Sequence, residues 1–181
     1  MAKTGSARAA NAIAKKNRDL QEQLWPGSGA WVWDRDRHRG FTTLPRTMPL
    51  VMRVMDGLAP KGQPVSATYL ALWCAGWDSP FVALRPRELA YAAGFGGQRA
   101  EHTWAGRMRL LKGLKFIDTK PGKAGEFTYA LIFNPHLAIR HHRQEGTLGL
   151  DAGAVAALVD LAHEIGAKDM LEGEEATKAA A

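Results

Sequence analysis

The chain has 181 residues, of which 46% are hydrophobic and 23% charged, and its formal net charge at neutral pH is +6. This length and composition fit one core-forming domain with appendages. No apolar run approaches the roughly 20 residues of a membrane-spanning helix, and the N-terminal segment lacks the apolar stretch of a secretory signal. The single cysteine, Cys74, excludes a disulfide framework or a cysteine-based zinc finger. We therefore expect a cytoplasmic protein without membrane contact.

Charge is distributed unevenly along the chain. Basic residues outnumber acidic residues two to one over residues 1–133, and the balance reverses over residues 134–181. A basic body followed by an acidic segment indicates a polyanionic partner, although many proteins of high isoelectric point bind no nucleic acid.

The pattern of residues divides the chain into four segments. Residues 1–40 are predicted to form a basic arm. Ser6–Leu24 is rich in good helix formers but has few apolar positions, so it forms a surface helix or a disordered segment, and a loop follows at Pro26 and Gly27. A domain is predicted over residues 41–145, a C-terminal helix over 146–172, and a disordered tail over 173–181.

The start of the predicted domain contains a strand and two helices. Phe41–Leu44 has the β-branched and aromatic residues of a short strand. Apolar spacing predicts helices over Thr47–Leu58 and Ala67–Ala75, with Ser66 as the N-cap of the second.

The middle of the domain predicts two further helices and a β-hairpin. A short helix over Arg85–Ala93 is followed by a glycine-rich break and a longer helix over Gln98–Lys112, which Gly113 ends. Strands over 116–120 and 127–133 flank a turn, and the remaining helices are predicted over 136–143 and 151–170.

This order of elements is that of a winged helix-turn-helix, a mainly α fold with a small β-hairpin. Ala90 and Gly94 support it, since two helices that cross closely need a small residue and the turn needs a positive φ.

The longer predicted helix has a buried and an outward face. Trp104, Met108 and Leu111 fall within one sector and are expected to be buried. The outward face offers Arg99, His102, Thr103, Gly106 and Arg109, with Gln98 and Lys112 at its rim. Side chains of these types pair with base edges in a DNA major groove, although any solvated helix contains such residues.

Other basic residues extend this candidate DNA surface. Lys120 and Lys123 lie at the hairpin tip, where they would contact the DNA backbone or simply be solvated. Arg85 and Arg87 open the short helix and are placed to meet a phosphate. The arm, with Lys3, Arg8, Lys15, Lys16 and Arg18, would track DNA or form a solvated helix.

Four stretches of the chain resemble winged-helix proteins carried on bacterial plasmids, some of which are similar to replication initiators or transcriptional regulators. They are Phe41–Arg46, the helix around Leu72 and Trp73, Arg107–Ile117 and Tyr129–Pro135. The resemblance covers residues 41–143 and implies a DNA-binding role in plasmid biology. An initiator would usually carry two winged domains, and this chain has room for one.

Catalytic and metal-binding patterns are lacking in the sequence. The spacing of His136, His141, His142 and His163 does not match a zinc site, and the glycines at 94–97 lack the lysine and hydroxyl residue of a phosphate-binding loop. We expect no enzyme activity, no metal and no cofactor.

Two hypotheses of function follow. The first is a sequence-specific regulator of plasmid transcription, replication or partition that binds double-stranded DNA. It would form a homodimer through the C-terminal helix stripe Val155, Leu158, Ala162 and Ile165. The alternative is an adaptor that acts through protein contacts, for example in plasmid transfer or replication control.

Overall fold

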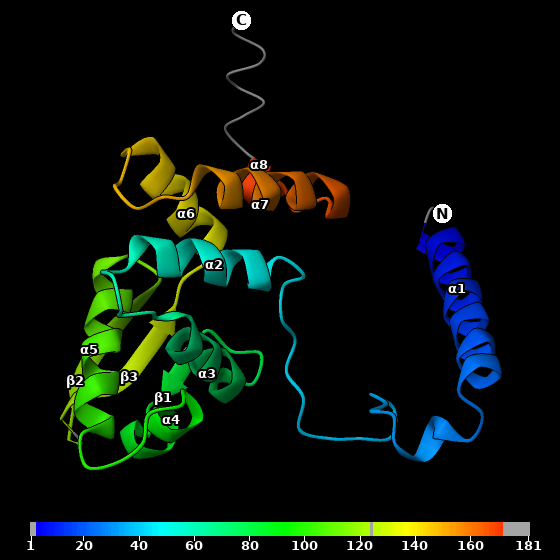
Figure 1. Cartoon of the computed structure of the whole chain (residues 1–181), viewed down its shortest axis with the longest axis horizontal. Coiled ribbons are helices and arrows are strands. Elements are labelled where there is room, and N and C mark those ends of the chain that lie inside the picture. The colour runs from blue at the N-terminus through cyan, green and yellow to red at the C-terminus, as the bar shows by residue number, and fades with distance from the viewer. Residues whose placement is uncertain (1–2, 124, 172–181) are drawn as a thin grey trace, which may run out of the picture. The chain divides into compact units, whose positions relative to one another are not determined.

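A computed structural model describes residues 3–123 and 125–171, and the chain in it divides into two units, Met1–Phe41 and Thr42–Ala181 (Figure 1). The tail predicted over 173–181 lies outside the described residues. None of the described helices is both long enough and apolar enough to cross a membrane.

The first unit consists of one long helix and an irregular segment. Helix α1 spans Lys3–Leu24, which confirms the predicted helix, and a 3-10 turn η1 follows at Ser28–Ala30. The ring of Trp33 stacks near His38 and meets Phe41 edge-on, with ring centroids 6.2 and 6.0 Å away. These aromatic contacts lie within the unit itself.

The second unit begins with helices α2 (Met48–Leu58) and α3 (Ser66–Gly76). The predicted strand over Phe41–Leu44 is wrong: this segment pairs with no strand, and Thr43 instead donates its backbone N–H and its hydroxyl to Asp78. Ser66 is not the N-cap of α3. The carboxylate of Asp56 on α2 accepts the backbone N–H groups of Val65 and Ser66 at 2.7 and 2.9 Å and thereby caps α3 from another helix.

A small sheet follows, in the order β1 (Phe81–Ala83), β3 (Gly125–Ile132), β2 (Ile117–Gly122), and all its strands are antiparallel. The predicted hairpin is confirmed as β2 and β3, with Thr119 opposite Ala130. Strand β1, where Val82 pairs with Ala130, was not predicted. It has three residues, and its partner strand β3 lies far along the chain.

Helices α4 (Pro86–Ala92) and α5 (Ala100–Gly113) connect β1 to the hairpin. The prediction for their turn is confirmed, because Ala90 is buried and Gly94 has a φ of +86°. Helix α5 begins two residues later than predicted, so Gln98 belongs to the turn and Arg99 is the N-cap residue.

Three helices complete the unit: α6 (Pro135–Gln144), α7 (Ala152–Ile165) and α8 (Lys168–Leu171). The single helix predicted over 151–170 is interrupted because Gly166 adopts a φ of +70° after α7. Helix α7 packs alongside α2 (Figure 1). Of its predicted stripe, Val155, Leu158 and Ala162 are buried, and Ile165 is half-buried. This stripe is therefore not available as the dimer surface that the sequence suggested.

The core lies between the helices and the inner face of the sheet. Its largest fully buried side chains include Trp104, Tyr69, Phe116 and Leu72. The rings of Tyr69 and Phe116 meet edge-on at 5.9 Å. Burial raises the pKa of Tyr69 to about 12. The phenol is therefore neutral at physiological pH and donates to the carbonyl of Phe133.

Candidate nucleic-acid interface

Helix α5 has the two faces that the sequence predicts. Trp104, Met108 and Leu111 are buried in the core. The opposite side, which we call the α5 face, consists of exposed or half-buried residues, namely Arg99, His102, Thr103, Gly106 and Arg109. The N-terminal part of this face carries a guanidinium, an imidazole and a hydroxyl.

The C-terminal part of the α5 face contacts the hairpin through Arg109. This guanidinium donates two hydrogen bonds to the carboxylate of Glu126 on β3, from Nε to Oε1 at 3.1 Å and from Nη2 to Oε2 at 2.6 Å. The bond to Glu126 raises the pKa of Arg109, and the same bond lowers the pKa of Glu126. Both groups remain ionised at neutral pH and neutralise each other.

A second contact ties α5 to β2. The ammonium of Lys112 lies 2.9 Å from a carboxylate oxygen of Asp118 and 3.2 Å from the carbonyl oxygen of Thr119. Lys120 also approaches Asp118, at 3.7 Å. The hydrogen bond from Lys112 is the largest cause that lowers the pKa of Asp118. Arg109, Lys112 and Lys120 thus lie together, as the sequence implies, but each has an acidic partner.

The other predicted cations lie around the ends of this surface. Lys123 is exposed at the hairpin tip, next to an irregularity in the strand register between Lys120 and Gly122. Arg85 pairs with Glu88 at 3.2 Å. Arg87 is exposed on α4, and no ion pair forms at Arg87 or Arg99 within the described residues.

A groove beside the turn between α4 and α5 brings Arg87 and Gln98 together. Its volume is about 620 Å³, and we call it the turn groove. Tyr91 also lines it and is 81% exposed. Sequence reasoning did not include Tyr91, although its position one helical turn after Arg87 was a usable signal.

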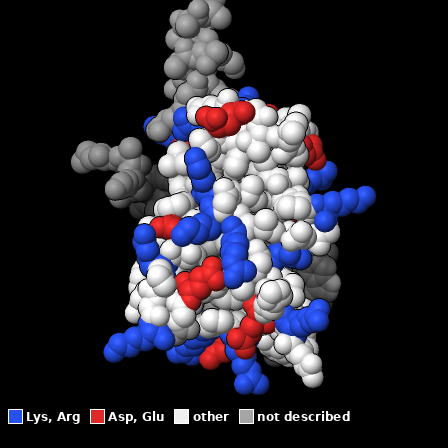
Figure 2. Space-filling model, turned by 90° about the vertical axis from the view of Figure 1, so that its left-hand side faces the viewer, with Lys and Arg blue, Asp and Glu red and all other residues white. Residues whose placement is uncertain are grey.

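The surface that contains α5 and β2 is mixed in charge (Figure 2). Lys and Arg side chains project from much of it, and Asp and Glu side chains lie between them. The described structure therefore offers separated cations rather than a continuous basic patch.

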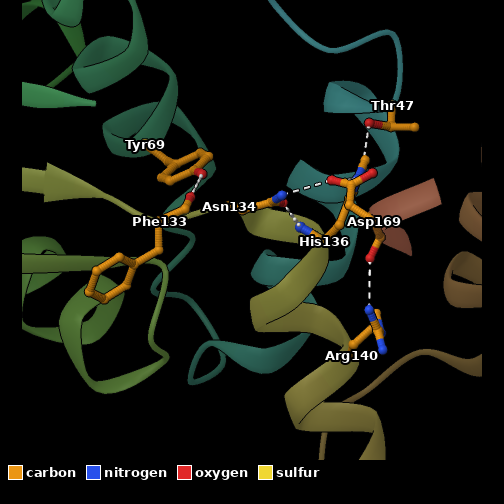
Figure 3. A network of polar contacts seen from close by, with 7 residues as sticks. All are labelled: Thr47, Tyr69, Phe133, Asn134, His136, Arg140 and Asp169. Carbon is orange, nitrogen blue, oxygen red and sulfur yellow. Dashed lines mark hydrogen bonds and ion pairs between the residues drawn. The ribbon is translucent and has the colours of Figure 1, made fainter. Parts of the chain in front are cut away.

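The sequence did not predict a network of hydrogen bonds that joins Thr47, His136 and Asp169 (Figure 3). The hydroxyl of Thr47 lies 2.7 Å from Nε2 of His136, and Nδ1 of His136 lies 2.9 Å from Oδ2 of Asp169. This order of groups is that of a nucleophile, base and acid. Thr47, however, is fully buried, so its hydroxyl is closed to a dissolved substrate. This network of hydrogen bonds joins the start of α2 to α6 and α8.

The histidines do not assemble a metal site in the described residues. No group of three or more metal-ligating side chains occurs there. His136 is occupied by Thr47 and Asp169, and the ring of His142 contacts the carbonyl of Leu114 at 2.8 Å. Both side chains therefore connect segments of the fold.

Comparison of the chain with models of known protein families, with curated proteins and with solved structures finds no significant match.

Proposed function

We propose that α3, β1, α4, α5, β2 and β3 form a winged helix-turn-helix that binds specific sequences in double-stranded DNA. The contacts of Arg109 and Lys112 with the hairpin carry this proposal. They put the outward face of α5 and the hairpin on the same side of the molecule, which is the arrangement needed for a helix and a wing to engage one duplex. The strand order β1, β3, β2 is consistent with this assignment.

The N-terminal half of α5 is the part best suited to read bases. Arg99 at the helix start can donate two hydrogen bonds to guanine, and His102 and Thr103 follow on the same face. Gly106 leaves the next turn open, because no atom lies within 4 Å of the position a Cβ would take. A sugar–phosphate strand can approach the helix closely there.

The remaining cations supply contacts to the DNA backbone. Lys123 at the wing tip and Arg87 with Tyr91 in the turn groove flank α5. Contacts of this kind position a protein on the duplex without reading sequence, and they weaken as salt rises. By the resemblance to plasmid winged-helix proteins, the activity would serve plasmid regulation in the cytoplasm.

Selection from a random duplex pool at about 50 and 200 mM salt tests the proposal. We expect an enriched motif that persists at the higher salt. Arg99→Ala should weaken binding to that motif by about 1–3 kcal/mol and reduce the base selectivity at one position of the motif. Arg53→Ala is the matched control, since Arg53 is an exposed arginine on α2 outside the proposed interface.

Three results would count against specific recognition. Binding without an enriched motif would indicate nonspecific association, and unchanged affinity in Arg99→Ala would remove α5 as the reading helix. Absence of binding at both salt concentrations would reject DNA binding altogether.

A second candidate function, a protein-interaction adaptor, is favoured by the outer face of the sheet. Phe81 and Tyr129 stack with ring centroids 5.7 Å apart and are 55% and 41% exposed, with Leu131 opposite Phe81. Exposed aromatic side chains are common in protein interfaces. This function predicts that Phe81→Ser leaves DNA affinity unchanged and abolishes binding to a partner protein.

A further inference from the structure

A hollow of about 520 Å³ lies on the second unit, away from the residues proposed to contact DNA. We call it the Asp169 hollow. Its apolar walls come from the end of α3, the end of β3 and the end of α7, through Trp73, Ile132, Phe133 and Ile165. Its volume and mostly apolar lining are those of sites for small organic molecules.

Asp169 places a charged group in this hollow. The two side-chain hydrogen bonds that hold its carboxylate, from Asn134 at 2.7 Å and from His136 at 2.9 Å, both go to Oδ2 (Figure 3). No side chain among the described residues donates to Oδ1, and the Asp169 side chain is 41% exposed. Burial raises the pKa of Asp169, but the bonds from Asn134 and His136 outweigh it and leave the pKa below its usual value.

The hydrogen bonds from Thr47 to His136 and from His136 to Asp169 hold this carboxylate in one orientation. Thr47 and His136 are both buried. Arg140 also contacts Asp169, since its guanidinium donates to the backbone carbonyl of Asp169 at 3.0 Å. An ionised group that is oriented by the buried His136, and whose Oδ1 accepts from no side chain of the described residues, is prepared to accept a donor from a ligand.

The other charges around the hollow favour a cation over an anion. Asp78 lies on its lining, where Thr42 and Thr43 donate to its carboxylate. Arg46 also lines the hollow, but its guanidinium lies 3.7 Å from Glu164. Lysine is missing from the described lining. An anionic ligand would therefore meet two carboxylates and a guanidinium that already has a partner.

We propose that the Asp169 hollow binds a small organic cation with an apolar body. Its ammonium group donates to Oδ1 of Asp169, and its body lies against Trp73, Ile132 and Phe133. The indole adds attraction for both an aromatic body and a nearby positive charge. This proposal does not depend on DNA binding, because none of the proposed DNA contacts lines the hollow.

Two-dimensional NMR titration of the full chain tests the proposal, with phenethylamine and tryptamine as probes. The matched acids 3-phenylpropionate and 3-indolepropionate keep the rings and reverse the charge. We expect saturable shifts at Trp73, Phe133 and Asp169 with the amines. The acids should bind at least about tenfold more weakly, since each would put a second carboxylate beside Asp169.

Variants separate the roles of charge and space. Asp169→Asn should weaken amine binding about tenfold, whereas Asp160→Asn, the same change at an exposed site on α7 outside the hollow, should leave it unchanged. Ala167→Leu enlarges a side chain in the lining without changing charge and should abolish binding of amines and acids alike.

Thermal denaturation shows whether each variant folds. If Asp169→Asn does not fold, Ala167→Leu and the comparison of amines with acids decide the matter. Absence of saturable shifts with both amines, equal affinity for the acids, or amine binding that survives in folded Asp169→Asn or Ala167→Leu would overturn the proposal.

Discussion

At the scale of single residues, the pair formed by Arg109 and Glu126 sets how much positive charge the C-terminal part of the α5 face offers to a polyanion. Both side chains are more than half exposed, so solvent screens the pair and it contributes little to folding stability. Its effect on DNA is different, because Glu126 repels phosphates and occupies two of the five N–H donors of the Arg109 guanidinium.

Glu126→Gln should therefore strengthen DNA binding. We expect roughly a threefold to tenfold gain in affinity at low salt and a log–log salt slope steeper by about 0.9, as for one additional phosphate contact. Titrations of a duplex at several salt concentrations measure both quantities. Glu164→Gln, at an exposed position on α7, is the control, and an unchanged slope in Glu126→Gln would contradict the proposed interface.

Asp169 makes the stability of the fold depend on pH. Its pKa in the folded chain is lowered, as described above, so it stabilises the fold at pH values above its unfolded pKa. This contribution is lost as pH falls through the lower, folded pKa. We expect urea unfolding measured between about pH 7 and 3 to show a shallower loss of stability in Asp169→Asn. An unchanged acid dependence in that variant would contradict this.

At the scale of elements, the glycine inside α5 stands out. Gly106 has helical neighbours on both sides and open space where a Cβ would lie. Glycine in a helix interior is less favourable than alanine by about 0.8–1.0 kcal/mol, so the folded chain alone gives no reason for it. Close approach of a DNA strand would give one.

Gly106→Ala separates stability from binding. The substitution should raise the free energy of unfolding by about 0.5–1 kcal/mol and weaken specific DNA binding. Urea unfolding and duplex titration of the same preparation measure the two effects. Stabilisation without loss of DNA affinity would show that no backbone approaches this turn of the helix.

Two glycines, Gly57 and Gly149, bring α2 into close contact with the loop before α7. Gly149 has a φ of +88°, and a Cβ there would lie 2.6 Å from the carbonyl oxygen of Gly57. Gly149→Ala should therefore destabilise the fold by about 2 kcal/mol or more. Gly146→Ala is the control, since Gly146 has a φ of +61° but open space around it. Equal losses in thermal or urea unfolding would show that the contact with Gly57 is unimportant.

At the scale of the whole molecule, the hydrophobic core found among the residues with described burial lies in the second unit. Its buried apolar residues run from Met48 to Met170. A chain of residues 42–181 should therefore unfold in one cooperative transition with a Tm close to that of the full chain. If the basic arm contacts DNA, this shorter chain will show a shallower salt slope on the selected motif. Loss of the cooperative transition would show that the first unit is required for folding.

Local patterns in the sequence determined much of this architecture. Apolar spacing identified α2, α3, the buried face of α5 and the hairpin, because each depends on the period of a single element. Gly94 marked the turn between α4 and α5, since its φ of +86° is one that glycine adopts readily. Gly113 did not end α5 as predicted: it is the last residue of the helix, and the positive φ that follows falls on Lys115. The candidate DNA contacts were also named from sequence, and their role stays a prediction.

Tertiary structure alone decided which side chains meet. It paired β1 with β3, placed the Asp56 carboxylate on the start of α3, gave Arg109 to Glu126, and buried the α7 stripe against α2. It also assembled Thr47, His136 and Asp169 beside a hollow. These partners lie at least 9 positions apart along the chain, and Thr47 and His136 are separated by 89. The physical reason is that a periodic pattern shows which face of an element is buried, whereas packing against the rest of the chain determines what that face, and the charges around it, will contact.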